Sequence, residues 1–320
     1  MSSSRPAGSR RQAGDGYCPS RRLRSALPLV VVLALLAATP SIAAWPTDPS
    51  TNLPVCLAPV SQDEPQIVAD GSGGVIIVWQ STSPSGPGGV FAQHFDREGR
   101  PTWGENGIQV CSVSSRQLQP AIASDSSGGA IVAWQDDRSG RDLDVYAQRI
   151  DRSGALRWGA EGLAVSGAPG NQILPEITAD GHGGALIAWR DLRLDLAADL
   201  YAQAVDSTGR TRWAADGIPI VAGPGGQLVS QVVANGRGGG IIIWADTQSD
   251  RGATSVHAQQ VDADGNLVWG PNGVQVGDGA RQGTRPVAVG DGAGNAIVVW
   301  DSGLVYAQRL DESGRRLWGD

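Results

Sequence analysis

The sequence predicts an all-β fold, a five-bladed β-propeller built from four-stranded antiparallel blades. Three observations predict it. A tryptophan at the end of an apolar run recurs every 55 or 56 residues, each unit holds four short runs of strand-forming residues, and glycine-rich turns separate these runs. The recurring tryptophans are Trp79, Trp134, Trp189, Trp244 and Trp300. Five similar units in a chain of 320 residues indicate one closed array and not several unrelated domains.

The first run of each unit ends in a tight turn rich in Asp, Asn and Gly. In the second unit this run covers residues 120–125, and Asp125 begins the turn. These residue types tolerate the positive φ that a tight reversal needs. We therefore expect them to bond their own backbone and not to ligate a metal. The equivalent residues are Asp70, Asp180, Asn235 and Asp291.

The later runs of a unit predict how blades pack and where the loops lie. The second run, residues 130–134, is apolar on both sides, so both of its faces must be covered, as stacked blades would do. The third run, residues 145–148, leads through a second tight turn to a fourth run. We expect the fourth run to contain a second tryptophan, which is Trp103, Trp158, Trp213, Trp269 or Trp318. The other two connections are long and should emerge together, on what we call the long-loop face.

The two ends of the chain differ from the repeat. Residues 1–44 carry six Arg, a short apolar stretch and small residues, which predicts a cleaved signal peptide. An uncleaved anchor is the alternative, but an apolar stretch of thirteen residues is too short to cross a bilayer of about 30 Å. The propeller then covers residues 45–320, with blades at about 62–111, 117–166, 172–221, 227–276 and 282–318. Residues 45–55 resemble the part that the last unit lacks, so we expect this N-terminal strand to close the ring, a truncated chain being the alternative.

Charge and cysteine content limit the partners. The formal net charge is −7, and without residues 1–44, which carry six Arg and one Asp, it is about −12. Such a chain is unsuited to nucleic acid. No membrane span is expected after cleavage, so the sequence predicts a secreted, periplasmic or cell-surface protein. Cys56 and Cys111 hold the same repeat position, which places them far apart in a ring unless both lie near its axis. A disulfide between them is left open.

Several motifs of the unit resemble a known repeat. The order Gln117-x-x-Pro120, Gly-Gly129, Trp134-Gln-Asp-x-Arg138 and Asp144-Val-Tyr146 is similar to the WD-type propeller repeat of TolB and related surface proteins. The tail of the unit bears a weaker similarity to quinoprotein propeller repeats. The resemblance covers about residues 62–318 and implies the architecture. It implies little about function, and no cofactor pocket accompanies it.

The candidate ligand-binding residues lie at the ends of the long loops. A ring of glutamines recurs there, together with two Asp-x-Arg elements. Amide side chains around a ring would suit a repeated glycan or a protein surface, although the same amides could tie the loops to neighbouring backbone. The residues are Gln62, Gln117, Gln172, Gln227, Gln282, Asp136, Arg138, Asp191 and Arg193.

Catalysis requires a set of groups that occurs once, whereas most polar residues here recur. Glu176 is the one acid at its first-strand position, where the other units have Gln66, Ala121, Gln231 and Val287. A lone carboxylate is no acid–base pair. The sequence therefore predicts no catalytic residue, no metal and no cofactor. It favours an exported, non-catalytic binding module, with a five-bladed glycosidase-like enzyme or a purely architectural repeat as alternatives.

Overall fold

The computed structural model describes residues 45–46, 48–83, 86–194, 198–221, 226–247, 254–280 and 284–319. The chain divides into residues 1–41 and 42–320, and all described residues belong to the second part. The predicted signal peptide, residues 1–44, and Gln282 lie outside the described residues. None of the described segments forms an apolar helix of the length that a membrane crossing requires.

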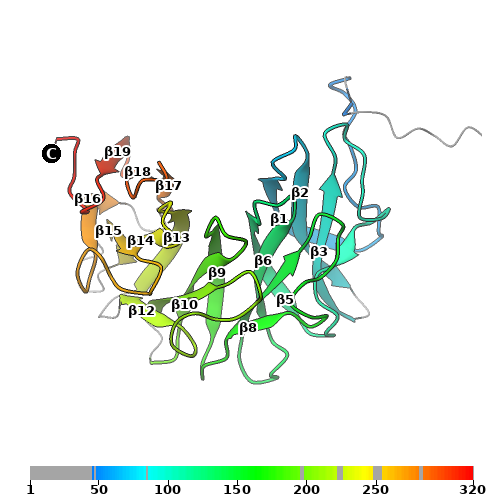
Figure 1. Ribbon diagram of the computed structural model, residues 1–320, viewed down its shortest axis with the longest axis horizontal. Coiled ribbons are helices and arrows are strands. Elements are labelled where there is room, and N and C mark those ends of the chain that lie inside the picture. Colours follow the sequence, from blue (N-terminus) through cyan, green and yellow to red (C-terminus); the bar gives the residue numbers. More distant parts are fainter. Residues whose placement is uncertain are drawn as a thin grey trace, which may run out of the picture. The chain divides into compact units, whose positions relative to one another are not determined.

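Five antiparallel sheets follow one another along the chain (Figure 1), and within each sheet every strand pairs with the next in sequence. The first sheet holds β1 (Ser61–Ala69), β2 (Val75–Ser83), β3 (Gly86–Phe95) and β4 (Ile108–Gln109). The second holds β5 (Gln117–Ser124), β6 (Ala130–Asp136), β7 (Asp144–Ile150) and β8 (Leu163–Ser166). The third holds β9 (Gln172–Ala179), β10 (Ala185–Asp191), β11 (Asp199–Val205) and β12 (Ile218–Val221). The fourth holds β13 (Gly226–Ala234), β14 (Gly240–Thr247), β15 (Thr254–Val261) and β16 (Val274–Ala280), and the fifth holds β17 (Val287–Gly290), β18 (Ala296–Asp301) and β19 (Val305–Leu310).

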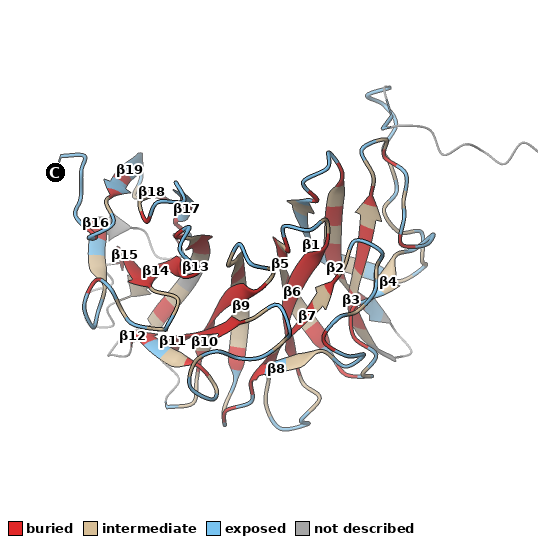
Figure 2. Cartoon of the chain, in the orientation of Figure 1, coloured by how far each residue is buried: buried red, intermediate tan, exposed pale blue. Residues whose placement is uncertain are grey.

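These sheets are the five blades of the predicted propeller, which the structure confirms. The first strands of successive blades, β1, β5, β9, β13 and β17, contact one another in that order. They are therefore the inner strands of the propeller. The apolar second strand is covered on both sides as expected, since β6 is buried at every residue (Figure 2).

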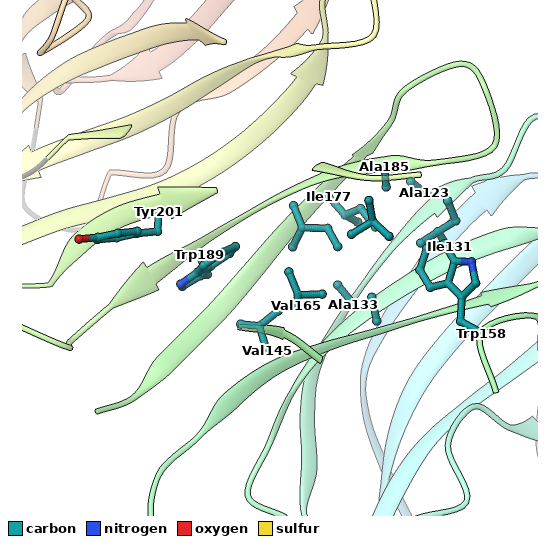
Figure 3. Packing of buried hydrophobic residues seen from close by; sticks show 13 residues of the cluster. Ala123, Ile131, Ala133, Val145, Trp158, Val165, Ile177, Ala185, Trp189 and Tyr201 are labelled. Atoms are coloured by element: carbon teal, nitrogen blue, oxygen red, sulfur yellow. The ribbon is translucent and has the colours of Figure 1, made fainter. Parts of the chain in front are cut away.

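Apolar side chains between neighbouring blades form the core. Between the second and third blades, Ile131, Ala133 and Val145 pack with Ile177 and Trp189 (Figure 3). Similar clusters join the first blade to the second, the third to the fourth, and the fourth to the fifth. Burial of each branched or aromatic side chain contributes about 1.5–3 kcal/mol, so the stacking of blades stabilises every sheet that has a neighbour.

The turn after the inner strand is held by its acid, as the sequence predicts. One carboxylate oxygen of Asp125, Oδ1, accepts the backbone N–H groups of Ser127 and Gly129, both at 2.8 Å. The equivalent side chains make the same pair of bonds to their own turns: Asp70, Asp180, Asn235 and Asp291. The role of these aspartate and asparagine side chains is therefore to stabilise their own turns.

The second tryptophan of the unit does not lie in the fourth strand, so that expectation is wrong. In the second blade, β8 begins at Leu163, after Trp158. The Trp158 ring instead reaches the next blade, where its Nε1 donates to the carbonyl of Ser207 at 3.3 Å. The equivalent bonds run from Trp103 to Arg152, from Trp213 to Ala263 and from Trp269 to Glu312. This tryptophan links consecutive blades.

The expected closure of the ring by residues 45–55 is not met. Within the described residues the fifth sheet has three strands, and no strand of residues 45–55 pairs with β19. Trp45 instead lies against Phe95 of the first blade, with ring centroids 6.0 Å apart, and its Nε1 donates to the carbonyl of Arg97 at 3.0 Å. Trp45 therefore takes the place of the linking tryptophan for the first blade. Residues 45–55 thus resemble the end of the repeat because Trp45, like the linking tryptophans, packs against the next blade, and not because they form a strand.

Cys56 and Cys111 are free thiols in the structure. The Cys56 sulfur accepts a hydrogen bond from Nε2 of Gln62 at 3.3 Å. Cys111 is buried, and Nη2 of Arg138 donates to its sulfur at 3.2 Å. The Cys111 sulfur thus links the end of the first blade to Arg138 of the second blade.

Candidate functional site

The inner strands carry a bulge that turns one residue toward the propeller axis. The pairing of β1 with β2 shifts between Asp63 and Gln66, and Glu64 within this shift has a φ of 52°. A residue other than glycine at positive φ is strained, so the surroundings must hold it. The residue that follows the bulge is Pro65, whose ring fixes the entry to the rest of the strand.

The same bulge recurs in the next two blades, and the preceding blade holds it. Gln119 has a φ of 51° and Leu174 a φ of 53°. Oε1 of Gln80 in the first blade accepts the N–H of Gln119 at 3.0 Å. Oε1 of Gln135 in the second blade accepts the N–H of Leu174, also at 3.0 Å. The bulge is therefore a constructed feature, and it lies near the end of the sheet from which the long loops emerge.

The bulges line a pocket at the axis, which we call the axial pocket. Its charged lining residues are Glu64, Glu176 and Arg285, which come from the first, third and fifth blades. The amides of Gln66 and Gln119 add hydrogen-bonding groups. These residues differ from blade to blade, unlike most polar residues of the repeat. They are thus the asymmetric set that catalysis or specific binding requires.

The two acids of the pocket have different surroundings. Glu64 is exposed, whereas Glu176 is half-buried. Burial raises the pKa of Glu176 from 4.5 to about 7, and the positive charge of Arg285 opposes part of that rise. Near neutral pH a substantial fraction of Glu176 therefore carries a proton that it can donate. An exposed carboxylate and a proton-carrying acid that line the same pocket offer the two kinds of group that general acid–base chemistry uses.

Sequence comparison found Glu176 but missed Glu64. When the repeats are aligned, Glu176 occupies the position that Gln66 holds in the first blade and Val287 in the fifth. Glu176 and Gln66 both line the axial pocket. Glu64 lies two positions before Gln66, and two such side chains share a face in a regular strand. A bulge occurs here, with a φ of 52° at Glu64, and the Glu64 side chain lines the axial pocket. The sequence does offer a signal for these pocket residues, because each directly precedes the recurring proline at its inner strand. The residues are Glu64, Gln119, Leu174 and Arg285.

The predicted glutamines lie in contacts with neighbouring backbone. Gln117 is 1% exposed; its Nε2 donates to the carbonyl of Val113 at 3.0 Å, and its Oε1 accepts the N–H of Val90 at 3.0 Å. Gln172 is also buried, and its Nε2 donates to Gly170. Gln62 donates to Ala58 and Cys56, and Gln227 is buried. The structure does not bring these amides into one surface, and their role in ligand binding stays a prediction.

The two Asp-x-Arg elements fold into their own blades. Asp136 is fully buried, and its Oδ2 accepts Nε1 of Trp134 at 2.9 Å and Nη2 of Arg138 at 2.6 Å. The Arg138 guanidinium also lies 3.6 Å from the ring centroid of Tyr146. Burial raises the pKa of Asp136, but the hydrogen bonds from Arg138 and its neighbours bring that pKa below its usual value. The pair is thus an ionic tie between the long loop and the blade.

The third blade repeats this arrangement. The Oδ2 atom of Asp191 accepts Nε1 of Trp189 at 2.8 Å and Nη2 of Arg193 at 2.6 Å. Arg193 stacks on Tyr201 at 3.9 Å. Ligand binding by these four charged residues remains a prediction, because their described contacts are with the protein itself.

Comparison with known proteins gives no family assignment. No protein-family model matches the chain, and no curated protein matches it in sequence. Among solved structures, the chain is similar to the endo-arabinase of Bacteroides thetaiotaomicron VPI-5482, with 13% identity over 81% of this chain and 96% of that one, at a TM-score of 0.45. It is also similar to the α-L-arabinanase of Penicillium chrysogenum complexed with arabinobiose, with 12% identity over 82% of each chain and a TM-score of 0.43. The polysaccharide lyase Uly1 shows 12% identity over 78% of this chain and 58% of that one, at a TM-score of 0.48.

Two sequence-based expectations need correction here. The similar structures are not TolB-type proteins, and of that resemblance only the all-β propeller architecture is supported. The expectation of a non-catalytic chain is also wrong. It rested on a lone axial carboxylate, whereas the pocket contains Glu64 as well as Glu176.

Proposed function

We propose that the chain is a glycoside hydrolase that works at the axial pocket, with Glu176 as the general acid and Glu64 as the second carboxylate. The observation that supports this proposal is the axial pocket, which Glu64 and Glu176 both line, and burial raises the pKa of Glu176 to about 7. Hydrolysis of a glycosidic bond needs one acid that protonates the leaving oxygen and one carboxylate that activates water or attacks the sugar. Two acids in unlike surroundings meet that need.

The remaining lining residues suit a sugar. Gln66 and Gln119 offer amide donors and acceptors for hydroxyl groups. Ile122, Leu174 and Ile177 add apolar surface for the face of a sugar ring. The substrate would then lie at the axis, near the ends of the long loops. The expected binding face and the proposed catalytic pocket are thus on one side of the propeller.

The proposal includes the place of action. Residues 1–44 have the pattern of an export signal, and most glycan polymers are outside the cell membrane. We propose an exported hydrolase that meets its glycan there. The likeness of the repeat to TolB-type sequences bears on the architecture and adds no argument for the substrate.

The decisive experiment compares turnover of aryl glycosides and polysaccharides by the unchanged chain and three variants. Glu176→Gln and Glu64→Gln should each lower kcat/KM by about a hundredfold or more. Glu161→Gln, which alters an exposed acid outside the pocket, should change it by less than about twofold. Circular dichroism must show that all variants fold. Full activity in Glu176→Gln, or no turnover of any glycoside by the unchanged chain, would overturn the proposal.

The stereochemistry of the product tests the role of Glu64 separately. A retained anomer identifies Glu64 as the nucleophile, and an inverted anomer identifies it as the base for a water molecule. Proton NMR of the first product distinguishes the two. Either outcome agrees with the pair, and loss of turnover in Glu64→Gln decides whether Glu64 takes part.

A further inference from the structure

Arg285 is a cation of the axial pocket that forms no salt bridge with the described residues. Its side chain is exposed and lines the pocket with Glu64 and Glu176. Among the residues that the structure describes, it forms no ion pair with any carboxylate. Arg138 and Arg193 differ from it, because both are paired with an aspartate and stacked on a tyrosine ring. The repeat thus has a structural use for other arginines but shows none for Arg285.

The position of Arg285 is one that the fold leaves free to vary. It precedes Pro286, as Glu64 precedes Pro65 and Gln119 precedes Pro120. An acid, an amide and a leucine occupy this position in the first three blades, so the architecture does not demand arginine in the fifth. The positive charge also reaches the proposed acid, because Arg285 opposes the rise in the pKa of Glu176. Arg285 is therefore close to where the reacting bond would lie.

We propose that Arg285 recognises the carboxylate of an acidic sugar, so that the glycan bound at the axial pocket contains uronic acid residues. This inference rests on the proposed function for the identity of the site. A guanidinium presents a planar fork of N–H donors that matches a carboxylate in two parallel hydrogen bonds. Neutral sugars leave such a fork without a partner. The charge-assisted pair of hydrogen bonds therefore favours an acidic sugar over a neutral one.

The test measures binding separately from turnover. Isothermal titration of the full chain carrying Glu176→Gln compares three probes: glucuronic acid, its uncharged methyl ester, and glucose. The acid should bind about tenfold or more tightly than either neutral probe, as expected for a charge-assisted hydrogen bond. Adding Arg285→Gln should remove that preference. Arg212→Gln, which alters an exposed arginine outside the pocket, should leave the preference unchanged.

The outcomes separate this inference from the proposed function. Equal binding of the acid and the two neutral probes overturns the inference, even if the unchanged chain hydrolyses neutral glycosides. A preference that survives Arg285→Gln overturns it as well. If the acid is preferred through Arg285 while no glycoside is turned over, the acidic-sugar site stands and hydrolysis does not.

Discussion

Trp158 of the second blade donates a hydrogen bond from its Nε1 to the carbonyl of Ser207 in the third blade, at 3.3 Å. The ring lies directly over Gly209, where an added Cβ would come within 2.7 Å of Cδ1 of the indole. Similar contacts occur at Gly154, Gly265 and Gly314, each beneath the linking tryptophan of the preceding blade. One glycine in each of these turns is therefore required by a neighbour and not only by the turn.

Replacement of Gly209 by alanine tests this contact. Gly209→Ala should lower the free energy of unfolding by about 3 kcal/mol, from backbone strain of about 1 kcal/mol together with displacement of a packed ring. Gly181→Ala is the matched control, since Gly181 also has a positive φ, +80°, but nothing lies within 4 Å of the new Cβ. It should cost about 1 kcal/mol. Urea denaturation measures both, and equal losses would show that the indole contributes nothing.

Two adjacent aspartates should respond very differently to loss of charge. Asp136 is fully buried against Arg138, whose side chain is 14% exposed, whereas the Asp137 pair with Arg116 is open to water. Removing one partner of a buried pair costs about 3 kcal/mol or more, and an exposed pair contributes less than about 1 kcal/mol. Asp136→Asn should therefore destabilise the chain by about 3 kcal/mol and Asp137→Asn by under 1 kcal/mol in urea titrations.

The same pair of variants bears on the predicted binding role of Asp136. A ligand-binding residue should weaken glycan capture when it is changed, measured at a temperature where the variant is folded. If Asp136→Asn captures a glycan as well as Asp137→Asn does, its effect is structural. A loss of capture confined to Asp136→Asn would restore Asp136 to the binding site.

The repeat made much of the fold predictable, because the relevant forces are local or recur. Asp125 caps its own turn, so its role could be inferred from four neighbouring residues. The burial of β6 followed from an apolar run that lacks alternation. Each inference could be checked against four other copies of the same pattern. Agreement among copies is what gave the strand and turn positions.

The axial pocket could not be derived in this way, because its residues differ among copies. Glu64 lies in a bulge of β1, and a comparable bulge at Gln119 is held by Gln80 of the preceding blade. The hydrogen bond between Gln119 and Gln80 joins two blades, so a single unit does not reveal it. The pKa of Glu176 is likewise set by burial at the axis, which depends on several blades together.

Ring closure failed as a prediction for a related reason. Residues 45–55 match the end of the repeat through one side-chain contact, that of Trp45, and not through a whole strand. The consequence is visible at Val305, which is 78% exposed, whereas its counterparts Val90 and Val145 are fully buried. A pattern predicts that a residue can be buried, but a neighbour must be present to bury it.

Val145 and Val305 offer a direct measure of what stacking contributes. Val145→Ala should lower the free energy of unfolding by about 2 kcal/mol, because two methyl groups leave a filled interface between blades. Val305→Ala removes the same atoms from an exposed position of the same repeat and should change stability by less than about 0.5 kcal/mol. Chemical denaturation compares the two. A loss of about 2 kcal/mol at Val305 would mean that this face is covered in solution, as it would be in a closed ring.

The raised pKa of Glu176 also makes a prediction about stability. The unfolded chain should release this proton near pH 4.5 and the folded chain near pH 7. Between these values the folded state binds more protons than the unfolded state, so the free energy of unfolding must fall as the pH rises through that window. The full shift corresponds to about 3 kcal/mol, and we expect about 2 kcal/mol because Glu176 keeps part of its surface in water.

Glu176→Gln removes the titrating group. The free energy of unfolding of this variant should therefore equal that of the unchanged chain at pH 4.5 and exceed it by about 2 kcal/mol at pH 8. Glu161→Gln serves as the control, since its exposed side chain lies outside the pocket. Urea titrations at pH 4.5, 6 and 8 give the three differences, and a gap between Glu176→Gln and the unchanged chain that stays constant with pH would show that Glu176 does not titrate in the folded state as the structure requires.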